Sequence, residues 1–115
     1  MDTIKTLVIE PLRRPELRDI DPTITTIGKT IGGYAEPLPL DRRTTLWCDE
    51  EGAIRNLKPN RTIRLSQDSR LADAGKPIII RGTFVITGPH PQDGPLGLDD
   101  EQIGRYAAMF ADPEA

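Results

Sequence analysis

The stretch Ile78-Ile79-Ile80-Arg81-Gly82-Thr83-Phe84-Val85-Ile86-Thr87 decides the fold. It is the most apolar and most β-branched run of the chain, and Pro77 and Gly88-Pro89 bound it. Continuous apolar runs of this length are typical of strands that are buried on both faces. We therefore expect one central strand over 78–87 with a paired neighbour on each side. Gly82 interrupts the run, which predicts a bulge or a close approach by another segment.

Periodic segments on both sides of this run predict the other elements. Prolines and glycines separate them and act as turn signals. We expect Asp21 to cap the first helix, and Asp99 to form a capping box with Gln102 in the second. Gly32-Gly33 is interpreted as the cap that ends the first helix rather than as an anion nest. Strands are expected over 4–10, 16–20, 34–40, 44–49 and 62–65, and helices over 22–31 and 100–111.

These elements predict an α+β fold. A single mainly antiparallel sheet of about five strands is expected, with two helices packed on it and covering one face. In the strand over 44–49, alternation places Leu46 and Cys48 on one face of the sheet and Trp47 on the other.

The composition predicts a cytoplasmic protein with a single domain, 1–115, and long surface loops at 66–77 and 88–97. A chain of 115 residues buries about two thirds of its unfolded surface, which is enough for a core without disulfides. The single cysteine, Cys48, fits a reducing compartment. The first residues do not have the pattern of a signal peptide, and no apolar run approaches the ~20 residues of a membrane helix.

Charge is distributed unevenly, although the net charge is only −3. Residues 53–82 have seven basic and two acidic side chains, whereas residues 93–115 have six acidic and one basic. The basic middle and the acidic end can attract each other or face different partners. Arginine outnumbers lysine 11 to 4. This preference fits anion recognition by planar guanidinium groups, although the codon bias of a GC-rich genome is the simpler explanation.

The basic middle segment supplies the candidate ligand-binding residues. We expect it to hold a small anion, such as a nucleotide, through charge-assisted hydrogen bonds. The simpler alternative is a solvated basic face beside the acidic end of the chain. No aromatic platform alternates with basic residues and the chain is acidic overall, which argues against a nucleic-acid polymer as partner. The candidate residues are Asn56, Asn60, Arg61, Arg64 and Arg81.

The sequence offers few residues for metal or nucleophilic chemistry. His90 is the only histidine and Cys48 the only cysteine, so a zinc site rich in nitrogen or sulfur cannot be built within one chain. No cofactor, no metal and no catalytic residue are expected. Cys48 falls inside a predicted strand, where a cysteine usually packs as a small apolar residue. A small hydrolase with Glu50 or Glu51 as general base is the enzymatic alternative.

Six short motifs follow one another along nearly the whole chain. As an ordered set they resemble domain of unknown function family 3846, whose members are small proteins common in bacteriophages, mobile elements and bacterial genomes. The resemblance carries no activity; it implies a small cytoplasmic accessory protein that acts by binding rather than by turnover. The motifs are Leu7-Val8-Ile9-Glu10-Pro11, Ile31-Gly32-Gly33-Tyr34, Cys48-Asp49-Glu50-Glu51-Gly52, Leu57-Lys58-Pro59-Asn60-Arg61, Gly82-Thr83-Phe84-Val85-Ile86 and Leu98-Asp99-Asp100-Glu101-Gln102-Ile103.

Three functional hypotheses follow from these observations. The first is a non-enzymatic binding module for a host protein or a small anionic ligand, such as a nucleotide, that it sequesters. The second is a protein-binding inhibitor of a host factor, whose acidic helix with Asp99, Asp100 and Glu101 mimics nucleic acid. The third is the small hydrolase. Exposed strand edges favour a homodimer.

Overall fold

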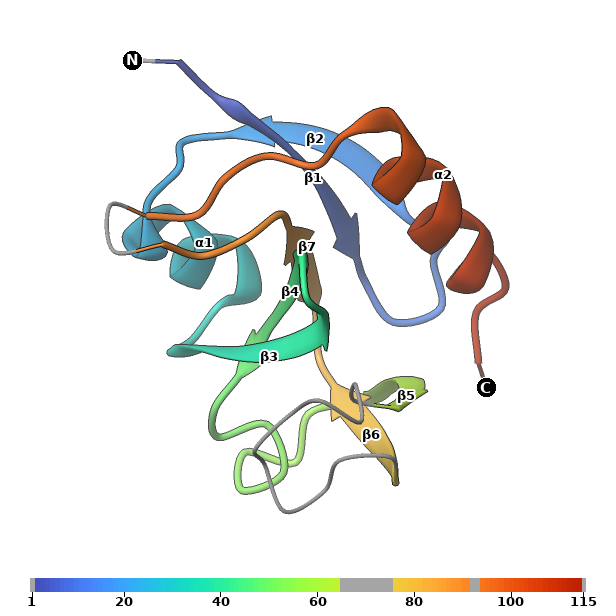
Figure 1. Ribbon diagram of the computed structural model, residues 1–115. Helices are drawn as coiled ribbons and strands as arrows, with labels where there is room; N and C mark the ends of the chain where they lie inside the picture. Colours follow the sequence, from blue (N-terminus) through green and yellow to red (C-terminus); the bar gives the residue numbers. More distant parts are fainter. Residues whose placement is uncertain (1, 65–75, 92–93, 115) are drawn as a thin grey trace.

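The computed structural model describes residues 2–64, 76–91 and 94–114 (Figure 1). The described residues form an α+β domain, as the sequence predicted. Most of the predicted loop 66–77 lies outside them, and residue 77 begins a strand. The elements are β1 (Ile4–Ile9), β2 (Glu16–Ile20), α1 (Ile24–Ile31), β3 (Ala35–Asp41), β4 (Thr44–Asp49), β5 (Pro59–Arg64), β6 (Pro77–Arg81), β7 (Phe84–Thr87) and α2 (Asp100–Met109).

The strands form two sheets rather than one. The main sheet has five antiparallel strands in the order β2-β1-β7-β4-β3, and β5 and β6 form a separate antiparallel ribbon. β7 is the central strand, paired with β1 on one side and with β4 on the other. Among the described strands, β2 and β3 are therefore the outermost strands of the main sheet.

The expected single strand over 78–87 is wrong, because the chain turns at Gly82. This glycine has a φ of +77°, a conformation that other residues rarely adopt. A Cβ there would lie 2.8 Å from the Leu57 Cδ1 atom, so the predicted close approach at Gly82 is confirmed. The Gly82 N–H also donates to the Lys58 carbonyl oxygen at 2.8 Å. The turn sends 84–87 into the main sheet and leaves 77–81 to pair with β5.

The main sheet is covered on both faces, which corrects the expectation that both helices cover one face. Side chains alternate along each strand, so Leu46 and Cys48 face α2 and the ribbon, whereas Trp47 faces α1. Val8 and Val85 also face α1, and Leu7, Phe84 and Ile86 face α2. Because the central strands bury apolar side chains on both sides, each face needs its own helix (Figure 1).

Both helices begin and end at capping residues. Asp99 and Gln102 form the predicted capping box at the start of α2. α1 begins two residues later than expected, because the Thr23 hydroxyl rather than Asp21 accepts from the Thr26 N–H. Gly32 ends α1 with a φ of 85° and an N–H bond to the Gly28 carbonyl oxygen, as predicted. Neither helix of the described chain is long and apolar enough to span a membrane.

Candidate functional site

The five residues predicted to bind an anion do not form one surface cluster. Asn56 lies in the turn after β4, where it has a positive φ of 53°, and Arg64 lies at the end of β5; both are exposed. Arg81 is half-buried and donates to the Leu57 carbonyl oxygen at 3.2 Å. Asn60 and Arg61 are inside the protein, with exposed fractions of 1% and 2%. Among the described contacts of these five residues, a direct side-chain hydrogen bond joins Asn60 and Arg61.

Arg61 connects three separate parts of the chain through its guanidinium group. Its Nε and Nη2 donate to the Phe110 carbonyl oxygen at 3.3 and 2.9 Å, and Nη2 also donates to the Arg13 carbonyl oxygen at 2.7 Å. Its Nη1 donates to the backbone and side-chain oxygens of Asn60 at 3.4 and 2.7 Å. A guanidinium group has five N–H donors, and these five contacts use them all. No donor is left to bind a ligand without breaking an internal bond.

Asn60 completes this buried polar cluster. Its side-chain nitrogen donates to the carbonyl oxygens of Ile9 and Gly82, both at 2.9 Å, while its side-chain oxygen accepts from Arg61. The amide therefore holds the end of β1 against the turn that separates β6 from β7. These contacts indicate that Asn60 and Arg61 stabilise the fold. Their predicted role in ligand binding stays a prediction.

An open hollow lies on the other side of the molecule, between α1 and the start of β3. Its volume is about 540 Å³ and its lining is mainly apolar. Two large side chains at the hollow remain accessible: Tyr34 is 74% exposed and Ile24 is 50% exposed. The lining residues are Ile24, Thr25, Gly28, Lys29, Gly32, Gly33, Tyr34 and Ala35. These two exposed side chains make the hollow a candidate binding surface.

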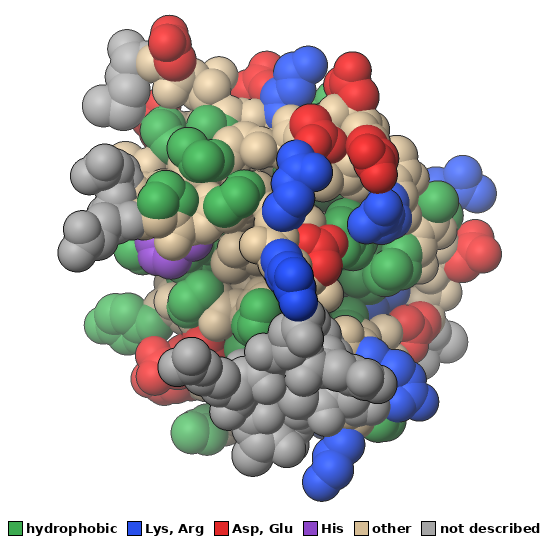
Figure 2. Space-filling view, in the orientation of Figure 1, with side chains coloured by type: hydrophobic (Ala, Val, Ile, Leu, Met, Phe, Trp, Pro, Cys, Tyr) green, Lys and Arg blue, Asp and Glu red, His purple; other side chains and the backbone are tan. Residues whose placement is uncertain are grey.

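The surface around this hollow differs from the surface over α2. In Figure 2, hydrophobic side chains gather toward the left of the view, and charged side chains of both signs are more numerous on the upper right, over α2.

An ion pair beneath the hollow holds its floor in place. The Asp49 side chain is 1% exposed and pairs with Arg55, which also donates to the Gly32 carbonyl oxygen at 3.2 Å. A Cβ at Gly33 would overlap the Asp49 carboxylate and lie 2.7 Å from Arg55 Nη1. Gly33 is therefore needed so that the backbone can lie directly on this ion pair.

The same end of β4 fixes the backbone of Tyr34. The Glu50 N–H donates to the Tyr34 carbonyl oxygen at 2.9 Å, so the residue that precedes β3 is tied to the residue that follows β4. The Asp49 carboxylate accepts from the Glu51 N–H at 2.8 Å, which closes the turn. The exposed ring of Tyr34 therefore projects from a backbone whose carbonyl group is held by the turn after β4.

Among the described residues, Lys29 is the one cation that lines the hollow. It lies in the last turn of α1 and its side chain is exposed, where the negative end of the helix dipole stabilises a positive charge. Across the Gly32 backbone lies Arg55, whose charge is paired with Asp49. The hollow thus combines an apolar wall, a projecting aromatic ring and one exposed lysine.

The structure also separates the residues that a Cys–His pair would need. His90 packs edge-on against Trp47, with ring centroids 4.8 Å apart, whereas Cys48 points to the opposite face of the sheet. Burial, with further contributions from Glu36 and Asp49, raises the pKa of the Cys48 thiol to about 12, which disfavours the reactive thiolate. In the described part of the chain, no three His, Cys, Asp or Glu side chains form a group suited to a metal ion.

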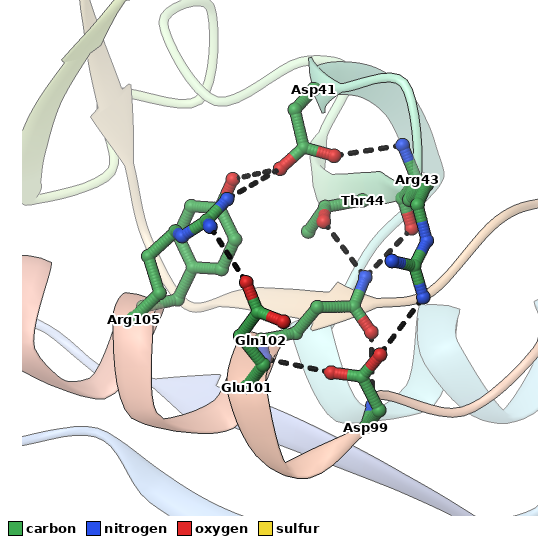
Figure 3. Close-up of polar contacts among 8 residues, drawn as sticks. Asp41, Arg43, Thr44, Asp99, Glu101, Gln102 and Arg105 are labelled. Carbon is green, nitrogen blue, oxygen red and sulfur yellow. Dashed lines mark hydrogen bonds and ion pairs between the residues drawn. The ribbon is translucent and has the colours of Figure 1, made fainter.

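The acidic start of α2 is bound to the turn between β3 and β4 (Figure 3). Gln102 donates to the Arg43 carbonyl oxygen and to the Thr44 hydroxyl, both at 2.9 Å. Arg43 pairs with Asp99 at 2.9 Å, and Arg105 pairs with Glu101 at 3.1 Å. Two of the three carboxylates in the inhibitor hypothesis therefore have internal partners.

Asp41 and Tyr106 complete the contact between this turn and α2. The Tyr106 hydroxyl donates to the Asp41 carboxylate, which also accepts from the Arg43 N–H at 2.7 Å. Burial favours a neutral Asp41, but these hydrogen bonds outweigh it and lower the pKa of its carboxyl group. Burial and the neighbouring Asp41 raise the pKa of Tyr106 to about 12. The cluster keeps Asp41 charged and Tyr106 neutral near pH 7, so its role is to attach α2.

Fold and site together define a small α+β domain with an apolar surface hollow on one side of a sheet. The family model described as a domain of unknown function (DUF3846) matches residues 4–111. The chain belongs to this family, which confirms the resemblance carried by the six motifs. No curated protein and no solved structure matches the chain. The origin in a phage or mobile element and the cytoplasmic location stay predictions.

Proposed function

We propose that the protein is a non-enzymatic binding module that sequesters a small planar anion, such as a nucleotide, in the hollow between α1 and β3. The supporting observation is the size and lining of the hollow. Its volume of about 540 Å³ falls within the 300–1,000 Å³ range that is usual for small-molecule sites. A second hollow, beside Asn60 and Arg61, has only about 120 Å³, which suits a single side chain.

Each part of such a ligand has a matching group in the hollow. The ring of Tyr34 supplies a stacking surface for a base, and Ile24 supplies apolar contact. Lys29 supplies a positive charge for a phosphate. A Cβ at Gly28 would lie only 3.0 Å from the Gly33 carbonyl oxygen, so glycine at this position lets α1 pack closely on the turn that follows it.

The enzymatic alternative has less support. Glu50 and Glu51 are exposed in the turn after β4 and line neither of the two hollows. A general base works within hydrogen-bond reach of a bound substrate, and neither carboxylate is among the described lining residues of these two hollows, although the Glu50 backbone contacts Tyr34. Binding without turnover is therefore the function that we propose.

Isothermal titration calorimetry with mono-, di- and cyclic nucleotides tests the proposal. Stacking of a base on an aromatic ring contributes about 1–3 kcal/mol, so Tyr34→Ala is expected to weaken binding by about 5- to 160-fold. Exposed ion pairs contribute at most about 1 kcal/mol, so Lys29→Gln is expected to weaken binding by up to about fivefold.

Two control variants lie away from the hollow. Ile79→Ala removes a side chain of the ribbon that is 56% exposed, and Lys58→Gln removes an exposed cation between β4 and β5. Both are expected to bind the nucleotide as the unaltered protein does. Equal weakening by Ile79→Ala and Tyr34→Ala, or no binding of any nucleotide by the unaltered protein, rejects the proposal.

We also propose a homodimer that forms through the edge of β2. The edge of β3 is less suited to pairing because Pro37 and Pro39 have no N–H donor. On β2, Leu17 is 52% exposed beside an open edge. Light scattering of the unaltered protein and of Leu17→Lys tests this, since a charge at the contact is expected to give monomers.

A further inference from the structure

The C-terminal end of the chain is seated on the outer edge of β5. The Glu114 carboxylate accepts from the Thr62 N–H at 2.9 Å and from the Thr62 hydroxyl at 3.1 Å. Among the described strands, β5 pairs with β6 alone, and this N–H lies on the side of β5 away from β6. Carboxylate oxygens that bind an N–H and an O–H together form charge-assisted hydrogen bonds. The edge of β5 thus already holds a carboxylate.

A buried positive charge lies next to this carboxylate. The five hydrogen bonds of the Arg61 guanidinium go to four oxygens, and none of these is a carboxylate oxygen. Burial lowers the pKa of Arg61, and the Glu114 and Asp112 carboxylates counteract this. The positive charge of Arg61 therefore attracts anions to the nearby protein surface, because electrostatic attraction is stronger where solvent is excluded. The basic segment 53–82 and the acidic segment 93–115 are therefore in contact here, which is one of the two arrangements expected from their opposite charges.

The shape of this region fits one acidic side chain of an extended peptide. The hollow of about 120 Å³ is lined by Glu114 itself together with Pro59, Asn60, Arg61, Thr62 and Ile79. Ile79 lies opposite Thr62 in the ribbon and is 56% exposed. It provides apolar contact beside the carboxylate position. We call this region the β5 notch.

We propose that the β5 notch is a recognition site for an acidic extended peptide of a partner protein, and that residues 111–114 occupy it as an internal competitor. A partner peptide would place one carboxylate on Thr62, where Glu114 now lies, and would continue along the open edge of β5. The tail is joined to α2 by a few residues, so its effective concentration at the notch is of the order of 1 mM. Loss of the Glu114 carboxylate therefore opens the notch.

An NMR titration of the full chain tests this proposal. The probe is a synthetic peptide with the sequence Ala-Asp-Pro-Glu-Ala of residues 111–115, blocked at both ends so that its only charges are the two side-chain carboxylates. Glu114→Gln is expected to bind the peptide at least about tenfold more tightly than the unaltered protein, with the largest shift at the Thr62 amide. The control Glu16→Gln alters an exposed carboxylate on β2 and is expected to behave like the unaltered protein.

Two further titrations show which contact is responsible. A peptide with Gln in place of Glu is expected not to shift the Thr62 amide of the Glu114→Gln variant. Thr62→Val combined with Glu114→Gln is expected to weaken binding, because the hydroxyl donor is lost. The proposal is overturned if up to roughly 10 mM peptide, ten times the effective concentration of the tail, leaves the Thr62 amide of Glu114→Gln unshifted. Equal binding by the unaltered protein, or by the Gln peptide, also overturns it.

Dilution of the unaltered protein shows whether the tail comes from the same chain. We expect the Thr62 amide shift to be independent of protein concentration, because the contact is intramolecular. If the Thr62 shift and the mass measured by ultracentrifugation both change on dilution, Glu114 of a second copy occupies the notch. This result would overturn the proposal that the competitor belongs to the same chain.

Discussion

Replacement of Arg61 by methionine is expected to cause a large loss of stability. The substitution keeps an unbranched side chain of similar length and removes all five donors. It leaves the Phe110, Arg13 and Asn60 oxygens without their bonds from Arg61. An unsatisfied buried polar group costs about 1–3 kcal/mol, so three such groups at about 1.5 kcal/mol each cost about 4–5 kcal/mol together. Removal of a buried charge offsets roughly 1–2 kcal/mol of this. We expect a net loss of about 3 kcal/mol in the free energy of unfolding.

Urea unfolding followed by tryptophan fluorescence measures this loss. Trp47 is the only tryptophan and is 1% exposed, so its emission reports the loss of the core. Small domains have a total stability of about 5–15 kcal/mol, and about 3 kcal/mol would lower the melting temperature by roughly 12–20 °C. The m-value is expected to stay constant, because the surface exposed on unfolding changes little.

Arg14→Met is the matched control for this prediction. Arg14 is exposed in the turn between β1 and β2, next to the Arg13 carbonyl that Arg61 binds. Substitutions at such positions usually change stability by less than about 0.5 kcal/mol. If Arg61→Met costs less than about 1 kcal/mol, or no more than Arg14→Met, the interpretation of Arg61 as the link between β1, β5 and α2 is refuted.

Three further predictions concern a glycine, a tyrosine and the cysteine. Gly33→Ala is expected to destabilise the protein by about 2–3 kcal/mol, because the new Cβ overlaps the Asp49 carboxylate. Gly104→Ala, where a Cβ meets nothing within 4 Å, is expected to stabilise α2 by about 0.5–1 kcal/mol; equal effects of the two changes in urea unfolding would contradict the close approach at Gly33. Tyr106 holds its proton more tightly when folded, with a pKa of about 12 against 10.0 when unfolded. Its contribution is therefore complete below pH 10 and is lost as the pH rises from 10 to 12, by up to about 2–3 kcal/mol. Between pH 10 and pH 12, Tyr106→Phe is expected to lose less of its free energy of unfolding than the unaltered protein does. Identical pH profiles of this free energy for the two proteins would argue against the effect. Cys48, whose pKa is raised to about 12, is expected to react with a thiol reagent only at the rate of unfolding. Fast labelling of the folded protein would show that the thiol is accessible.

Local features of the fold could be predicted because adjacent residues determine them. Asp99 and Gln102 are three residues apart, which is the spacing of a capping box. Gly32 ends α1 because a glycine adopts the left-handed conformation without strain. The alternation of Leu46, Trp47 and Cys48 between two faces also follows from strand geometry alone.

Long-range features could not be predicted, because contacts between distant residues decide them. Gly82 turns the chain since Leu57 packs against it, and that contact determines which half of the apolar run joins the main sheet. Arginine is seldom fully buried, so the composition of the segment predicted that Arg61 would be exposed on a basic surface. The contacts that bury it come from residues 48 and 49 positions away along the chain.

The candidate site was missed for the same reason. Ile24 has the spacing of a buried helical residue with Ile27 and Ile31, but it is 50% exposed, whereas the other two are buried. The hollow beside it depends on Asp49 and Arg55, which hold the turn after α1 from below. One sequence signal was present: Gly28, Gly32 and Gly33 concentrate small residues where a helix meets the next strand.

The most direct test of the proposed binding function is native mass spectrometry of the protein purified gently from cells that express it. The unaltered protein and Ile79→Ala are expected to retain a released species with the mass of a nucleotide, and Tyr34→Ala is expected to be bare. The same comparison reports the mass of the oligomer. A bare unaltered protein, or a ligand that Tyr34→Ala retains as fully as Ile79→Ala does, would contradict the assignment of the hollow between α1 and β3 as the binding site.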